Sequence, residues 1–270
     1  MTNIKLAFIG GGAMCEAIII GALKAKFIKP DNIFIGDPTA NRREYLETKY
    51  KVKTFADNEL VVKDADYVIL SIKPQYFEEV VNDNLVKKIN KKATIISIMG
   101  SVDISTIENL IPEKAIIRVM PNTPLAVGYG VSALAKNELV QIKDFNFAKD
   151  LFACAGEIVV VEERYMEAIT AVSGCGPGYV FVLIDALADA GVNAGLPRDM
   201  AIKLAAATFA GSGKMVIETG KHPAVLRDQV TSPGGTTIAG IYELEKSGVR
   251  AAMYDAVKAV LEKSEKLKGN

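Results

Sequence analysis

Short apolar runs alternate with amphipathic segments along the first half of the chain. The apolar runs predict strands at residues 4–9, 32–35, 67–72, 94–98 and 115–119. Between them, apolar positions at helical spacing predict helices at residues 13–25, 41–50, 57–63 and 76–88. Strands that are apolar throughout and alternate with helices are typical of a parallel sheet covered on both faces. Two further apolar runs, at residues 131–134 and 157–161, are expected to extend this sheet.

After residue 162 the pattern indicates helices only, separated by clusters of glycine and proline. The predicted helices cover residues 165–172, 177–192, 198–219, 235–246 and 249–268. We therefore expect an α/β chain of two domains, with a doubly wound parallel sheet in residues 1–162 and an all-α domain in residues 163–270.

One of the predicted helices, at residues 177–192, is apolar on nearly every side. A soluble protein must cover such a helix all round. Two explanations stay open. The helix forms the centre of its own domain, or it packs against a second subunit.

The composition narrows the class of protein. Of 270 residues, 50% are hydrophobic and 24% are charged, which is typical of a globular protein and not of a disordered one. Lys and Arg number 32, as do Asp and Glu, and no basic run occurs, so we expect no nucleic-acid partner. The longest apolar stretches fall short of the roughly 20 residues that cross a bilayer, so we expect no membrane association.

The three cysteines and the N-terminus indicate the cellular compartment in which the protein is expected. Cys15, Cys154 and Cys175 are widely spaced and fit no metal-binding pattern, which favours reduced thiols and predicts no metal site. The N-terminus lacks the charged region, long apolar segment and cleavage site of a signal peptide. We therefore expect a cytoplasmic protein.

A glycine-rich turn joins the first predicted strand to the first predicted helix. Gly10 permits a tight turn, and Gly12 lets the backbone approach a pyrophosphate at the N-terminus of the helix. At the third position of this motif, where Gly or Ala is usual, the chain has Cys15, which is also small. A strand before the turn and a helix after it are the context that dinucleotide binding requires, so the first domain is expected to be of the Rossmann type. The predicted cofactor contacts from this motif are Gly10 and Gly12.

The end of the second strand bears on which dinucleotide is bound. Asp37 lies where an acidic residue would bind the adenosine ribose of NAD. Arg42 and Arg43 follow shortly and would hold the extra phosphate of NADP, unless they only cover a solvated helix face. The sequence leaves NADH and NADPH both open.

Three later strands end in polar or proline-bearing turns. Because the carboxyl ends of parallel strands line the ligand crevice, these turns are expected to form a cradle for the cofactor. The predicted contacts are Ser71, Ile72, Lys73, Pro74, Met99 and Pro121.

A second glycine-rich segment opens the predicted helix at residues 235–246. Backbone N–H groups and hydroxyls at a helix start suit an anion such as a carboxylate, although the same residues also suit an ordinary helix start. The residues concerned are Ser232, Gly234, Gly235, Thr236 and Thr237.

Together these motifs resemble the 1-pyrroline-5-carboxylate reductase family, the last enzymes of proline biosynthesis, over essentially the whole chain. The segment from Asp228 to Thr237 is the most specific part of the match, whereas the glycine turn is generic. The resemblance implies an oxidoreductase that acts on a CH–NH bond and uses NADPH or NADH. It also implies helical domains exchanged within a dimer and higher assemblies of dimers such as a decamer. By position it implies cofactor contacts at Ile9, Gly10, Gly11, Gly12, Ala13 and Met14, and an adenosine contact at Asn58.

The resemblance further implies hydride delivery to the C=N carbon of the cyclic imine. Ser232, Gly234, Gly235 and Thr236 would hold the substrate, and Thr237 would contact the imine nitrogen as the catalytic residue. A 3-hydroxyacid dehydrogenase is the nearest alternative, but those enzymes resemble one another in using a lysine on the inter-domain helix, and this chain has no lysine between Lys149 and Lys203. A non-catalytic dinucleotide sensor is the other alternative, and turnover of an imine would separate the two.

Overall fold

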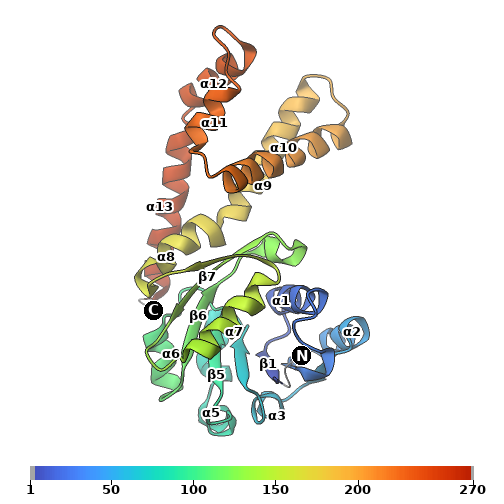
Figure 1. The fold of residues 1–270 in the computed structure, drawn as a ribbon, viewed down its shortest axis with the longest axis vertical. Helices are drawn as coiled ribbons and strands as arrows, with labels where there is room; N and C mark the ends of the chain where they lie inside the picture. Colours follow the sequence, from blue (N-terminus) through green and yellow to red (C-terminus); the bar gives the residue numbers. More distant parts are fainter. Residues whose placement is uncertain (1–3, 269–270) are drawn as a thin grey trace. The chain divides into compact units, whose positions relative to one another are not determined.

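The computed structural model describes the backbone of residues 4–268 and the side chains of residues 4–266. The chain forms two compact units, which are described separately (Figure 1). The sheet unit runs to Cys175 and includes the end of the chain from Leu261, and the helical unit is Gly176–Val260. The sheet unit therefore includes short helices after the last strand. The predicted domain boundary after residue 162 stays a prediction.

The sheet has eight strands in the order β3-β2-β1-β4-β5-β6-β7-β8. The strands are β1 Leu6–Ile9, β2 Ile33–Gly36, β3 Lys53–Phe55, β4 Tyr67–Leu70, β5 Thr94–Ser97, β6 Ile116–Met120, β7 Gly130–Lys136 and β8 Gly156–Val160. The predicted α/β fold is confirmed with one difference, because β7 runs antiparallel to β6. Only a short 3-10 turn, Thr123–Val127, lies in the connection between them, and a parallel crossover needs a longer one.

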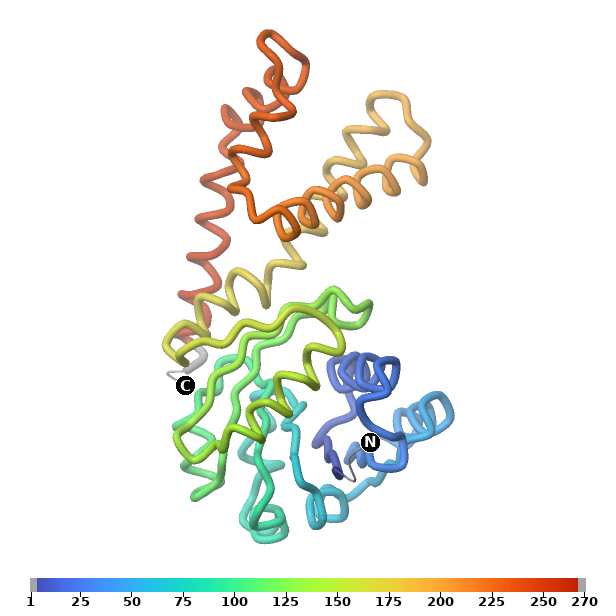
Figure 2. Tube along the Cα trace, viewed as in Figure 1, coloured from blue at the N-terminus to red at the C-terminus, as the bar shows by residue number. Residues whose placement is uncertain are grey.

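The helices of the sheet unit cover both faces of the sheet (Figures 1 and 2). They are α1 Ala13–Lys24, α2 Ala40–Tyr50, α3 Asn58–Val62, α4 Phe77–Val80, α5 Asp83–Lys88, α6 Ile104–Leu110, α7 Ile142–Ala153 and α8 Met166–Ile169. Side chains of β1 alternate between two buried clusters, with Leu6 and Phe8 in one and Ala7 and Ile9 in the other. Burial on both faces explains why this strand is apolar throughout.

The sequence missed some elements of the sheet unit. Strand β3 lies at the sheet edge and is too polar and short to stand out, and helices α6 and α7 were not predicted. The single helix predicted at residues 76–88 is wrong, because the chain forms α4 and α5 as separate helices. Asn82 between them accepts hydrogen bonds from the backbone N–H groups of Asn84 and Leu85 and so starts a new helix.

The helical unit consists of α9 Gly176–Asn193, α10 Arg198–Thr219, α11 Pro223–Gln229, α12 Thr236–Lys246 and most of α13 Val249–Lys268. Helix α11 was not predicted. Helices α9 and α10 pack through small residues, Ala188, Ala201 and Ala205, and a Cβ at Gly191 would lie 3.2 Å from the Cβ of Ala201. None of the described apolar side chains of α11, α12 and α13 is buried. The unit thus has little core of its own.

Candidate dinucleotide and substrate site

The glycine turn after β1 is held in a shape that requires glycine at its first position. Gly10 has a φ of +98°, and a Cβ there would lie 2.7 Å from the carbonyl oxygen of Ser71. The Ser71 hydroxyl donates to the carbonyl oxygens of Ile9 and Gly10, at 3.0 and 2.7 Å. The ends of β1 and β4 therefore form one rigid edge.

Gly12 provides the open side of this turn. It is the N-cap of α1 without a side-chain cap, and a Cβ there would meet nothing within 4 Å. The 12-residue helix α1 thus begins with exposed N–H groups and a face that a ligand can approach closely. These residues fit a dinucleotide pyrophosphate, which needs N–H donors and a close backbone approach.

Asp37 follows β2 and is bound to the glycine turn. Its Oδ2 accepts a hydrogen bond from the backbone N–H of Gly11 at 2.9 Å, and its Oδ1 accepts one from Thr39 at 2.9 Å. The carboxylate is half-buried and directed toward the turn, as a ribose contact requires.

The two arginines after β2 are engaged by the backbone. Arg42 donates from Nε to the Gly11 carbonyl at 2.5 Å and from a terminal nitrogen to Gly12 at 3.2 Å. Arg43 donates to the carbonyls of Asp37 and Pro38 at 2.8 and 3.0 Å. Arg42 is therefore neither a simple solvated residue nor a free phosphate ligand, because its guanidinium braces the glycine turn.

Glu16 on α1 completes this arrangement and was not predicted as part of the site. Its carboxylate accepts hydrogen bonds from Arg42, Tyr45, Lys49 and Tyr50. Burial alone would raise the pKa of this carboxyl, but the hydrogen bonds outweigh it and lower the pKa from 4.5 to about 2. Glu16 therefore stays ionised and fixes α2 to α1 beside the glycine turn.

The ends of β4, β5 and β6 lie at the same edge of the sheet as the glycine turn. The register pairs Ile9 with Leu70 and Leu70 with Ser97, so the residues that follow these strands are neighbours. Of the predicted contacts, Lys73 and Pro74 are exposed and Ile72 is half-buried. The Met99 side chain is 1% exposed and packs in the core, and Pro121 is buried, so these two present little but backbone.

Asn58 begins α3 and lies against the end of β2. A Cβ on Gly36 would lie 2.0 Å from the Asn58 side-chain oxygen, so a larger residue there would displace the Asn58 side chain. That oxygen is buried and has no hydrogen-bond partner among the described residues. It is a buried acceptor beside the end of β2.

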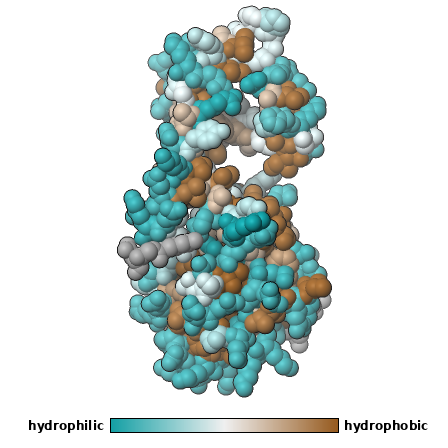
Figure 3. All heavy atoms as spheres, turned by 90° about the vertical axis from the view of Figure 1, so that its left-hand side faces the viewer, coloured by the Kyte–Doolittle hydropathy of each residue, from teal (hydrophilic) through white to brown (hydrophobic). Residues whose placement is uncertain are grey.

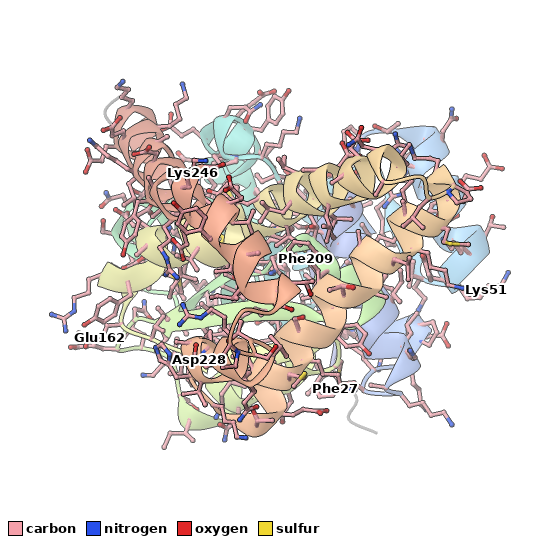
Figure 4. All side chains as sticks on the ribbon, turned by 90° about the horizontal axis from the view of Figure 1, so that it is seen from above. Phe27, Lys51, Glu162, Phe209, Asp228 and Lys246 are labelled. Atoms are coloured by element: carbon pink, nitrogen blue, oxygen red, sulfur yellow. The ribbon has the colours of Figure 1, made fainter. Side chains whose placement is uncertain are left out.

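The predicted substrate segment lies in the helical unit, between α11 and α12. In Figure 4 the labels on Asp228 and Lys246 mark the two helices that flank it. Gly234 has a φ of +68°, and Gly235 is the N-cap of α12 without a side-chain cap. Thr236 and Thr237 are exposed in the first turn. The N-cap of α12 is Gly235, so Thr237 does not serve as the helix cap.

The candidate residues thus divide between the two units. The predicted cofactor residues all belong to the sheet unit, and the predicted substrate residues all belong to the helical unit. The sequence missed Glu16 and the bracing role of Arg42. The only sequence signal for this contact is opposite charge on two predicted helices that follow consecutive strands, which is common on protein surfaces.

Helix α9 exposes much of its apolar surface. Phe181 is 62% exposed and Val182 is 68% exposed, and Ala188 is the helix's one buried residue. Figure 3 shows apolar side chains at the surface of the helical unit. The helix is therefore not the centre of its own domain.

Two helical segments, Glu163–Asn193 and Arg198–Thr219, are long and apolar enough to cross a bilayer by length and composition alone. One or two such helices are weak evidence for a membrane protein, because core helices of soluble proteins pass the same test. Asp185 and Asp189 interrupt the apolar run in the sequence, whereas the helix continues through them.

Two family models match the chain. Residues 5–101 match the NADP oxidoreductase, coenzyme F420-dependent family, and residues 163–267 match the pyrroline-5-carboxylate reductase dimerisation domain. The first match covers the glycine turn and the β4 end, and the second covers the segment at residues 232–237.

Relatives of similar length align along the whole chain. The pyrroline-5-carboxylate reductase of Synechocystis sp. is 43% identical over 98% of both chains. That of Escherichia coli is 37% identical over 97% of this chain and 98% of its own. The crystal structure of Plasmodium falciparum pyrroline carboxylate reductase with NADP bound has a TM-score of 0.89 at 34% identity and covers 99% of both chains.

The fold, the glycine turn and these matches define a dinucleotide-linked oxidoreductase with a helical dimerisation domain. The sequence resemblance to one family is also confirmed. The chain belongs to the pyrroline-5-carboxylate reductase family.

Proposed function

We propose that this protein reduces 1-pyrroline-5-carboxylate to L-proline, the last step of proline biosynthesis, with NADPH or NADH as the reductant. The observation that carries the proposal is the 43% identity to a reductase of that name over 98% of both chains. The glycine turn, whose N–H groups and open Gly12 fit a pyrophosphate, supports the use of a dinucleotide.

In this proposal the first unit binds the cofactor, and the nicotinamide supplies the hydride when bound. The cofactor contacts are Ile9, Gly10, Gly11, Gly12, Ala13, Met14, Asp37, Asn58, Ser71, Ile72, Lys73, Pro74, Met99 and Pro121. Asp37 binds ribose hydroxyls, and Asn58 contacts the adenosine.

The N-terminus of α12 binds the substrate. Its free N–H groups and the hydroxyls of Ser232 and Thr236 hold the carboxylate of the imine acid, while Gly234 and Gly235 keep the approach open. Thr237 donates a hydrogen bond to the imine nitrogen, and the imine is reduced most easily when that nitrogen is protonated. The protein therefore supplies orientation and a hydrogen bond rather than a strong acid.

We further propose that the helical unit is covered by a second copy of the chain, in a dimer or an assembly of dimers such as a decamer. The exposed apolar residues of α9 and the dimerisation family match at residues 163–267 support this. Three free cysteines suit a reducing compartment, so we place the protein in the cytoplasm.

The function is tested by adding 1-pyrroline-5-carboxylate to the purified protein with NADH or NADPH and following cofactor absorbance. We expect substrate-dependent oxidation of at least one cofactor without added metal or flavin. Folded protein that binds dinucleotide but oxidises neither cofactor would refute the proposal.

A further inference from the structure

We propose that Asp37 makes this chain select NADH over NADPH. The use of NADH in the reaction rests on the proposed function, whereas the preference in binding rests only on the residues of the sheet unit. NADPH differs from NADH only by a phosphate on the adenosine ribose. The group that the chain presents at the end of β2 therefore decides the preference.

The Asp37 carboxylate cannot easily turn away from an incoming ribose. Each of its oxygens accepts a backbone N–H at 2.9 Å, one from Gly11 in the glycine turn and one from Thr39. Each oxygen keeps a second lone pair, so it can still accept a ribose hydroxyl. A 2′-phosphate would bring a second anion to the same place and would be repelled.

The nearby cation that would offset this repulsion is already paired. Arg42 donates to Glu16 at 2.7 Å and to the Gly11 carbonyl at 2.5 Å, so its charge is balanced and its position is fixed. The low pKa of Glu16 keeps that partner ionised.

Arg43 is the second arginine that follows β2. One of its terminal nitrogens donates to the carbonyls of Asp37 and Pro38, so it lies beside the Asp37 backbone. While Asp37 is charged, its carboxylate repels a 2′-phosphate that Arg43 attracts, so the two effects offset one another. Without that negative charge, Arg43 favours NADPH.

The experiment measures dissociation constants for NADH and NADPH by nicotinamide fluorescence, and for ADP-ribose and its 2′-phosphate by calorimetry. The wild type should bind NADH at least about tenfold more tightly than NADPH, and ADP-ribose at least about tenfold more tightly than its 2′-phosphate. A tenfold ratio corresponds to about 1.4 kcal/mol of binding free energy. Asp37→Asn keeps an oxygen for one backbone N–H and removes the charge, and should shift the ratio at least about tenfold toward NADPH. In the control Asp64→Asn, whose carboxylate is 72% exposed, the ratio should not change.

Wild-type protein that binds NADPH as tightly as NADH would overturn the proposal, as would an unchanged ratio in Asp37→Asn. If Asp37→Asn does not fold, the same measurements on Asp37→Ser test the proposal. The ratio of the dissociation constants of ADP-ribose and its 2′-phosphate in the wild type tests it as well. Because these are binding measurements, a protein that prefers NADH but does not reduce the imine would refute the proposed function and leave this inference standing.

Discussion

The two units of this chain are equally rich in apolar residues but use them differently. In the sheet unit, every side chain of β1 is fully buried, and two clusters cover the two faces of the sheet. In the helical unit, α9 leaves Phe181 and Val182 more than half exposed, and the buried cluster consists of three alanines. The sheet unit buries its apolar residues within the single chain, whereas the helical unit exposes an apolar surface of the kind that marks interaction sites.

The largest expected effect comes from placing charges on the exposed face of α9. Phe181→Asp combined with Val182→Asp should weaken self-association at least about a hundredfold, because an unpaired charge buried in an interface is strongly destabilising. The double variant should still bind dinucleotide, since the sheet unit has its own core. Sedimentation velocity and cofactor fluorescence measure the two effects.

The control is Ile142→Asp, which places one negative charge on an 81% exposed apolar residue of the sheet unit and should not change the assembly. A wild-type protein that stays a 29.0 kDa monomer at working concentration would break the comparison. Partition of the wild type into lipid vesicles in place of self-association would break it too.

A smaller effect is expected from the buried ion pairs of the sheet unit. Arg118 on β6 is 1% exposed and donates to Glu163 at 3.2 Å and Glu167 at 3.1 Å. Arg118→Met leaves two carboxylates close together without their cation, and should lower the free energy of unfolding by about 3 kcal/mol.

Urea denaturation measures this loss. The control is Arg164→Met, which removes the ion pair with Glu162, whose two side chains are 67% and 68% exposed. It should lower the free energy of unfolding by less than about 1 kcal/mol. Equal losses in the two variants would mean that burial of Arg118 does not govern the stability of this unit.

The smallest effect on stability, and a specific effect on rate, is expected at Thr237. Removing a positioned proton donor typically lowers a rate by roughly 10²–10⁴-fold, and because the imine can arrive protonated, we expect Thr237→Ala to fall at or below about 10²-fold in kcat. Thr237→Ser should retain most of the activity. The melting temperature should hardly change, because Gly235 and not Thr237 caps α12. Wild-type turnover in folded Thr237→Ala would remove Thr237 from the mechanism.

The sequence predicted the elements whose pattern is set by burial within one unit. Strands β1 and β4 are apolar throughout because they are covered on both faces, and helix α10 begins and ends at the predicted residues. The edge strand β3 gave no such signal, since Lys53 is exposed and the strand pairs on one side only.

The side-chain contacts of the site were harder to predict. Asp37 was recognised from its place after a strand, but the pairing of Arg42 with Glu16 depends on how α1 and α2 pack. The sequence could not decide whether α9 is a core helix or an interface helix, because both are apolar all round. Only its exposure within the single chain separates the two.

The most direct test of the central claim follows the reducing hydrogen itself. The protein is given 1-pyrroline-5-carboxylate and NADH or NADPH that carries deuterium at the transferred position, and the product is analysed by mass spectrometry and NMR. The account predicts L-proline with one deuterium on the former C=N carbon, formed in equal amount to the oxidised cofactor. Oxidised cofactor without proline, or proline without the label, would contradict it.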